Sequence, residues 1–343
     1  MKSTIWKRFA LSATAAAIVT AMSPAFAADY TIRLGASQPA DHPMTATMNK
    51  FKEVAEKESG SRIKVEVYPA NQLGSQVQMN EGVKSGLVTM TYSSIAYIGG
   101  NYEPKYNSLM LPFLVRKDNV DKAWAALDGD VGKELQQSLE KIGIRAMGYG
   151  PIGSRHITNS KREIKSPADL AGIKIRLQPN KVHIDTFKAL GANPTAMDFS
   201  EVYSALQQGV IDAQENPIDI IATNRFNEVQ KYLTLTGHFY DFAGLWMNKA
   251  YYDKLPADLQ KVVSHASQEA MLFHRKLYDD KEQGYLDGLK KAGMQVYQPT
   301  PDELKKFQAA ADPVYAKFLS EAKDKAFVQK VWKIMGRDTA AAN

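Results

Sequence analysis

Hydrophobic and polar side chains alternate in two stretches near the start of the chain, at residues 30–35 and 62–68. A period of two predicts half-buried strands. Residues 44–58 and 76–85 carry apolar side chains at helical spacing, and residues 88–92 form another strand-like run. The order strand, helix, strand, helix, strand is typical of a mostly parallel sheet flanked by helices.

The same pattern resumes after Gly143. It predicts strands at 144–149, 173–177 and 245–248 and helices at 182–190 and 200–208. Two long helical regions are predicted at 256–292 and 301–334. No repeat or flexible linker separates the two α/β units, so we expect segments to cross between them, and the helix at 256–292 could bridge both. A cleft between two such units is a common place for a small-molecule site.

The N-terminus has the pattern of an export signal. Lys2, Lys7 and Arg8 precede an uncharged, mostly apolar stretch at 9–22, and the small side chains of Ala25 and Ala27 fit a signal peptidase. We predict a signal peptide at 1–27, cleaved after Ala27, and a periplasmic mature chain. The alternative is an uncleaved anchor, but the apolar core is shorter than the roughly 18–20 residues that span a bilayer. No later segment reaches that length without charges, so we expect no stable membrane insertion of the mature chain.

Composition removes several classes of function. The chain contains no Cys, which excludes thiol nucleophiles, disulfides and Cys-based zinc sites. Its formal net charge of +6 falls by 3 to +3 without the signal peptide, and no basic run appears, so nucleic acid is not an expected partner. The histidines lack zinc-hydrolase spacing, and the match Gly148-x-Gly150-x-x-Gly153 precedes an extended segment instead of a helix. We therefore expect neither a metal nor a cofactor.

Residues 153–217 are the most informative part of the sequence. They contain a series of recognisable phrases: Gly153-Ser154-Arg155, Ser166-Pro167-Ala168-Asp169-Leu170-Ala171-Gly172-Ile173-Lys174-Ile175-Arg176, Leu190-Gly191-Ala192-Asn193-Pro194 and Gln207-Gln208-Gly209-Val210-Ile211-Asp212-Ala213-Gln214-Glu215-Asn216-Pro217. Together with Tyr68-Pro69-x-x-Gln72-Leu73-Gly74 and Leu111-Pro112-Phe113, they closely resemble the substrate-binding proteins of tripartite ATP-independent periplasmic (TRAP) transporters, the dicarboxylate- and sialic-acid-binding type. The resemblance extends over the whole mature chain.

The resemblance implies an α/β, two-lobed periplasmic-binding-protein fold with a ligand cleft between the lobes and a long helix bridging both. We expect residues 28–152 plus 241–280 to form lobe I, and residues 153–240 plus 281–343 to form lobe II. It also implies a non-enzymatic function: capture of a small organic acid, such as a C4-dicarboxylate or a sugar acid, followed by lobe closure. TRAP-type membrane permease subunits would then receive the ligand, and an ion gradient would drive import.

Three residues are the main candidates for binding the anion. Arg176 ends a predicted strand, and a guanidinium offers a planar fork of donors that matches a carboxylate. The resemblance implies that it forms the main salt bridge to the ligand; from the residues alone, pairing with a structural acid is the alternative. Arg155 matches a second, supporting arginine, although it could be a solvated loop residue. Pro217 keeps Asn216 out of helical geometry, so its amide can face the cleft.

The remaining candidates depend more strongly on the resemblance. Phe199 corresponds to an aromatic that packs on the ligand, and the first lobe would contribute Tyr92, Ser93 and Ser94. Further candidates that could equally be packing residues are Ser37, Gln76, Tyr240, Phe242 and Trp246. Sialic-acid binders carry an acidic residue at the position of Ser94 and an arginine at that of Tyr97, and these departures argue against sialic acid as the ligand.

A second class of function stays open at this point, a periplasmic lyase or hydrolase acting on organic acids. Such an enzyme needs a general acid or base in the cleft. The candidates here are arginine, amide, hydroxyl and aromatic groups, which bind anions but transfer protons poorly. A ligand-binding partner of a sensor would share the same physics. The ligand itself stays open among dicarboxylates, sugar acids such as uronates, and other monocarboxylates.

Overall fold

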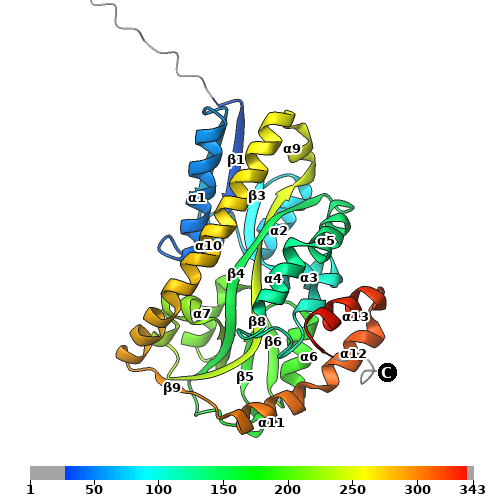
Figure 1. Ribbon diagram of the computed structural model, residues 1–343. Coiled ribbons are helices and arrows are strands. Elements are labelled where there is room, and N and C mark those ends of the chain that lie inside the picture. The colour runs from blue at the N-terminus through cyan, green and yellow to red at the C-terminus, as the bar shows by residue number, and fades with distance from the viewer. Residues whose placement is uncertain (1–27, 338–343) are drawn as a thin grey trace, which may run out of the picture.

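The computed structural model describes residues 28–337. The predicted signal peptide and residues 338–343 lie outside this range. Figure 1 shows an elongated molecule in which one twisted sheet runs along the length and helices cover it from both sides.

A single nine-stranded sheet connects the two ends of the molecule, in the order β2-β1-β3-β8-β4-β7-β5-β6, with β9 beside β8. Parallel pairs form at both ends, and two long antiparallel strands, β4 and β8, cross the middle (Figure 1). The strands are β1 (Tyr30–Gly35), β2 (Ile63–Tyr68), β3 (Met90–Ser94), β4 (Ile144–Asn159), β5 (Lys174–Leu177), β6 (Asn193–Ala196), β7 (Ala213–Asn216), β8 (Tyr232–Asn248) and β9 (Gln295–Tyr297).

Helices flank both halves of the sheet. They are α1 (Pro43–Glu58), α2 (Gln76–Ser85), α3 (Ile95–Asn101), α4 (Val120–Asp128), α5 (Asp130–Glu140), α6 (Lys181–Ala189), α7 (Val202–Gln207), α8 (Ile218–Thr223), α9 (Lys249–Lys254), α10 (Ala257–Lys291), α11 (Pro301–Ala311), α12 (Pro313–Glu321) and α13 (Lys325–Ile334). Short 3₁₀ turns are η1 (Pro104–Leu109), η2 (Pro167–Leu170), η3 (Phe199–Glu201) and η4 (Phe226–Glu228).

The helix α10 connects the two halves. It packs against α1 at one end of the molecule, against β4 in the middle and against α8 toward the other end. In Figure 1 it runs diagonally from beside α9 at the top, past β4, to the lower left of the molecule. The lobe boundaries given above stay a prediction; α13, from the segment expected in the second lobe, packs against η1 and α4.

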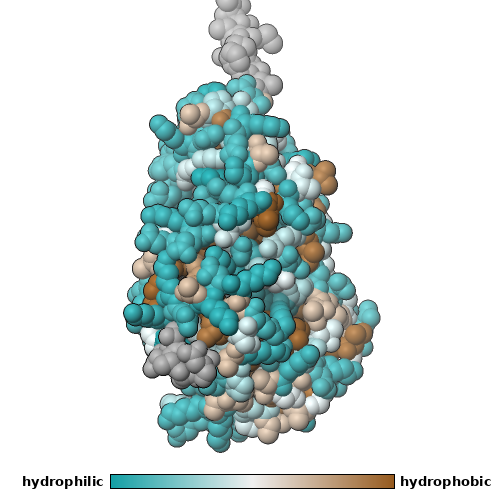
Figure 2. Space-filling view, turned by 90° about the vertical axis from the view of Figure 1, so that its right-hand side faces the viewer, coloured by the Kyte–Doolittle hydropathy of each residue, from teal (hydrophilic) through white to brown (hydrophobic). Residues whose placement is uncertain are grey.

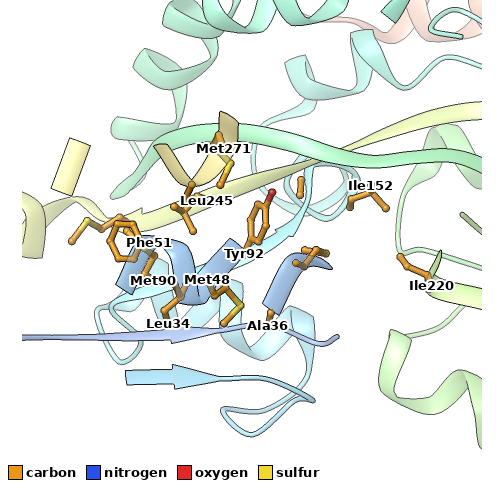
Figure 3. Packing of buried hydrophobic residues seen from close by; sticks show 14 of the residues in the cluster. Leu34, Ala36, Met48, Phe51, Met90, Tyr92, Ile152, Ile220, Leu245 and Met271 are labelled. Atoms are coloured by element: carbon orange, nitrogen blue, oxygen red, sulfur yellow. The ribbon is translucent and has the colours of Figure 1, made fainter. Parts of the chain in front are cut away.

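The apolar core beside the sheet is built where these elements meet. Figure 3 shows Met271 from α10 above Tyr92 and Leu245, with Phe51 from α1 in the same cluster. Ile220 from α8 lies apart, toward the other half. Residues of α10 from Leu259 to Leu289 belong to this cluster, so the helix contributes to the core over most of its length.

The start of α2 shows why a polar side chain faces the middle of the molecule. Ser75 caps the helix by accepting from the backbone N–H of Gln78, whose side chain returns the contact in a capping box. Gly86 ends the helix with φ 88°, a left-handed conformation that favours glycine. The capped first turn therefore holds Gln76 in a buried position.

The surface is largely hydrophilic on the side shown in Figure 2, with small apolar areas scattered over it. Among the helices within residues 28–337, none combines the length and the apolar character that a membrane crossing requires.

Candidate functional site

A small cavity lies where the two halves of the molecule meet. The free space between its lining residues, including the part that is open to solvent, is about 360 Å³. Its lining comes from both halves, mostly from residues at or just after the carboxyl ends of strands β1, β3, β5 and β7, which is where open α/β sheets place their ligands. The lining residues are Ser37, Gln38, Met44, Gln76, Ser93, Ser94, Tyr97, Ile152, Gln178, Phe199, Asn216 and Ile220.

Arg176 is fully buried and lies behind the cavity lining, where it contacts the lining residue Tyr97. Its Nε donates to the carbonyl of Met197 at 2.9 Å, and one Nη donates to the hydroxyl of Tyr97 at 3.2 Å. The guanidinium carbon lies 5.8 Å from the ring centre of Phe199. The other nitrogen, Nη1, is buried without a hydrogen-bond partner, and Arg176 forms no ion pair with a carboxylate in the described part of the chain. One arm of the fork is therefore available to an anion.

The strand β5 determines where Arg176 points. Ile175 and Leu177 belong to an apolar cluster with Phe187 and Phe239. Because side chains alternate along a strand, Arg176 projects to the opposite face from its two neighbours. Parallel pairing with β6 and β7 then fixes its position in the sheet.

Tyr97 lies beside the guanidinium and lines the cavity. Burial raises the pKa of its phenol, and the nearby positive charge of Arg176 opposes this only in part. The hydroxyl therefore stays protonated at neutral pH, accepts from Arg176 and keeps its own hydrogen for another acceptor.

Arg155 is also fully buried, but it lies in an internal network. It pairs with both oxygens of Glu215, donates to Asp241 at 3.0 Å and donates to the side-chain oxygen of Asn216 at 3.0 Å. It is thus not a solvated loop residue. In this arrangement Arg155 is charge-neutralised and reaches the cavity through Asn216.

The acids of this network are strongly perturbed. Burial would raise the pKa of Glu215, but the charge of Arg155 and hydrogen bonds from His238 and Arg155 hold it well below its ordinary value. Burial raises the pKa of Asp241 to about 6, with Arg155 and Ser94 opposing the rise. The cluster links β4, β7 and β8, and it contacts the cavity lining through Ser94 and Asn216.

Six of the predicted residues line the cavity: Ser37, Gln76, Ser93, Ser94, Phe199 and Asn216. Six others do not line it, and two of these, Arg155 and Arg176, contact the lining residues Asn216 and Tyr97 from behind. The hydroxyl of Tyr92 contacts Nδ1 of His274 at 2.6 Å. The three aromatic residues of β8 belong to an apolar cluster, and they are Tyr240, Phe242 and Trp246. The indole N–H of Trp246 also donates to the hydroxyl of Ser93 at 2.9 Å. Direct contact of any of these residues with a ligand stays a prediction.

Sequence reasoning did not select six of the lining residues, which are Gln38, Met44, Tyr97, Ile152, Gln178 and Ile220. Gln178 lies two residues after Arg176, just past the end of β5, so continued strand alternation could have directed it to the same cavity. In the sequence, Tyr97 stands out only as a departure from the sialic-acid binders. Within residues 28–337, no cluster of three His, Asp or Glu side chains is arranged to hold a metal ion.

Comparison with known proteins agrees with this architecture. Residues 34–322 match the family model "Bacterial extracellular solute-binding protein, family 7". The 2,3-diketo-L-gulonate-binding periplasmic protein YiaO of Escherichia coli is 36% identical over 278 residues, covering 81% of this chain and 84% of that protein.

Solved structures give the same result. The sugar acid binding protein DctPAm of Advenella mimigardefordensis, in complex with galactonate, has a TM-score of 0.85 at 32% identity, covering 91% of this chain and 98% of that one. A TRAP periplasmic solute-binding protein of Sulfurospirillum deleyianum with bound succinate has a TM-score of 0.84 at 30% identity, covering 90% and 100%. The expected two-lobed α/β fold is confirmed, and this chain belongs to family 7 of the bacterial extracellular solute-binding proteins, the TRAP type.

Proposed function

We propose that this protein captures a small organic acid in the periplasm and delivers it to the membrane permease subunits of a TRAP transporter. The ligand carboxylate would pair with Arg176 inside the cavity. Relatives that carry 2,3-diketo-L-gulonate, galactonate or succinate support an organic acid as the ligand class.

The observation that carries this proposal is the free arm of Arg176. A buried charge without a partner costs several kcal/mol, because it has lost its water and gained no counter-ion. Arg155, equally buried, has two carboxylates beside it. Arg176 has a carbonyl, a hydroxyl and an aromatic ring instead. An incoming carboxylate would supply the missing charge and satisfy Nη1.

Contacts between the halves support closure around the ligand. Asn180 donates to the carbonyl of Ala96 at 2.8 Å and to Asn107 at 2.7 Å, and Asn224 donates to Gln38 at 2.9 Å. A ligand that touches both halves only when they are together shifts the population toward this closed state. We propose the lobes at 28–152 plus 241–280 and at 153–240 plus 281–343, with release to the permease on reopening.

The cavity chemistry favours binding over catalysis. Its lining consists of hydroxyl, amide, thioether and apolar groups together with the phenol of Tyr97, whose pKa burial raises. These groups hold an anion in place but do not exchange protons readily at neutral pH. We therefore propose that the protein is not an enzyme.

A thermal-shift screen tests the proposal. Purified residues 28–343 are mixed with organic acids and with the matching neutral amides or alcohols. A ligand that binds only the folded state raises the melting temperature, so at least one acid should raise it while its neutral counterpart does not. The proposal is wrong if no carboxylate shifts the melting temperature, or if the neutral analogues shift it equally. Loss of uptake of that acid in cells lacking the protein tests delivery.

A further inference from the structure

We infer that the cavity selects a monocarboxylate bearing hydroxyl groups, such as an aldonate, over a dicarboxylate, and that Gln178 accepts a hydrogen bond from one of those hydroxyls. This rests on the proposed function, because it assumes that an organic acid binds beside Arg176. It adds a ligand class and a specificity-determining residue.

The first argument is the supply of positive charge. Within residues 28–337, Arg155 and Arg176 are the buried side chains among the lysines and arginines. Two carboxylates already neutralise Arg155. No residue that lines the cavity carries a positive charge. A second carboxylate would thus enter a buried site without a cation to pair with, and an unpaired buried carboxylate is strongly disfavoured.

The second argument is the direction of the hydrogen bonds. The hydroxyls of three lining serines donate to protein acceptors: Ser37 to Gln76 at 2.9 Å, Ser93 to Asn80 at 3.0 Å and Ser94 to Asp241 at 2.8 Å. The amide nitrogen of Asn216 donates to Gln214. The three serine hydrogens are therefore used inside the protein, and the serine oxygens offer a ligand only acceptor lone pairs, one of which is already taken in Ser93 and in Ser94. Asn216 keeps one amide hydrogen, because its nitrogen donates once and its oxygen accepts from Arg155. The serine acceptors match ligand hydroxyls and repel a second carboxylate.

The third argument is Gln178 itself. Its side chain is 5% exposed and lines the cavity, and its Oε1 is buried without a hydrogen-bond partner. A buried acceptor left unsatisfied costs free energy, so a bound donor at this position stabilises the complex. The cavity thus has a donor end, formed by Nη1 of Arg176 and the hydroxyl of Tyr97, and an acceptor region that includes Gln178.

Calorimetry with a matched panel of acids separates hydroxyl groups from the second charge. At four carbons the panel is erythronate, succinate, tartrate and butyrate; at six it is gluconate, adipate, glucarate and hexanoate, each in its available stereoisomers, at pH 7.5. In at least one length series the hydroxylated monocarboxylate should bind more than about tenfold tighter than the other three, since one unsatisfied buried group changes affinity by about tenfold or more.

A variant tests the residue. Gln178→Leu should weaken binding of the preferred hydroxy acid by about tenfold to a hundredfold and leave the unsubstituted fatty acid of the same length unchanged. The control is Gln207→Leu, at an exposed glutamine at the end of α7 that does not line the cavity; its affinities should equal those of the wild type. If Gln178→Leu fails to fold, the wild-type panel still decides the ligand class.

The outcomes distinguish the two proposals. A dicarboxylate that binds as tightly as the hydroxylated monocarboxylate, or a fatty acid that does so, overturns the inference and leaves the proposed function standing. If Gln178→Leu binds the preferred hydroxy acid with wild-type affinity, Gln178 does not accept a hydrogen bond from the ligand. If none of the eight acids binds, and the wider thermal-shift screen finds no carboxylate either, the proposed function itself fails.

Discussion

Replacing Arg176 by Met should separate ligand binding from folding. Met has a similar length and no charge, and it can fill the space between Phe199 and Tyr97. The structure predicts opposite consequences for the two properties, because the charge of Arg176 serves a ligand and not the protein interior. Binding of the preferred acid should collapse, and the ligand-free protein should stay folded and stable.

The magnitudes follow from the contacts. Removing one partner of a desolvated charge pair costs about 2–5 kcal/mol, so the dissociation constant should rise on the order of 30- to 5,000-fold. The free protein loses the hydrogen bonds to Met197 and Tyr97, about 0.5–1.5 kcal/mol each. The variant also no longer buries an unpaired guanidinium, and it is therefore relieved of a cost of several kcal/mol. The free energy of unfolding should therefore be unchanged or higher.

Two assays are needed, both on residues 28–343. Isothermal titration calorimetry measures the affinity, and urea unfolding without ligand measures stability. The reasoning is refuted if Arg176→Met binds with wild-type affinity. It is also refuted if the unliganded variant loses about 3–5 kcal/mol of stability, the amount expected for breaking a buried ion pair.

Three further predictions test the surroundings of the site. Arg155→Met should lower the free energy of unfolding by about 3–5 kcal/mol in urea unfolding, because it leaves Glu215 and Asp241 buried without a cation; stability equal to that of Arg176→Met would contradict this. The pKa of Glu215 is lower in the folded than in the unfolded chain, so its contribution to stability is present above pH 4.5 and is lost as the pH falls below that value. Glu215→Gln should therefore reduce the loss of unfolding free energy between neutral and acidic pH. An unchanged slope of stability against pH would oppose the assignment. Gly100→Ala should weaken ligand binding in calorimetry, because a Cβ there would lie 2.1 Å from the carbonyl oxygen of Pro179 in the other half. The control is Gly284→Ala, whose Cβ meets nothing within 4 Å and which should bind as the wild type does. Equal affinities of the two variants would argue against closure at this contact.

The elements with strong local signals could be predicted from the sequence. The helix at 76–85 has a capping box at one end and a glycine at the other, and the structure gives the same bounds. Strand β4 extends from Ile144 to Asn159 and β8 from Tyr232 to Asn248, both far beyond the predicted segments. Glycines and Pro151 interrupt the pattern of β4, and its bulges, which depend on pairing with β8, absorb those interruptions. The predicted helical region at 301–334 is three helices, with prolines at the start of two of them.

For the site as well, features that depend on long-range contacts could not be predicted from the sequence. Arg176 could be singled out because a strand end, a charge and a family phrase coincide. The surroundings of Arg155 could not, because Glu215 and Asp241 are 60 and 86 residues away in sequence and only the sheet pairing brings them together. The choice between a ligand arginine and an internally paired arginine depends on such long-range partners.

A crystal structure of the protein with its bound acid tests the central claim most directly. The account predicts a carboxylate oxygen of the ligand within hydrogen-bond distance of Nη1 of Arg176, inside the cavity lined by Phe199, Gln178 and Asn216. A ligand whose carboxylate lies elsewhere, with Nη1 still unpaired or bonded to a protein acid, would contradict it.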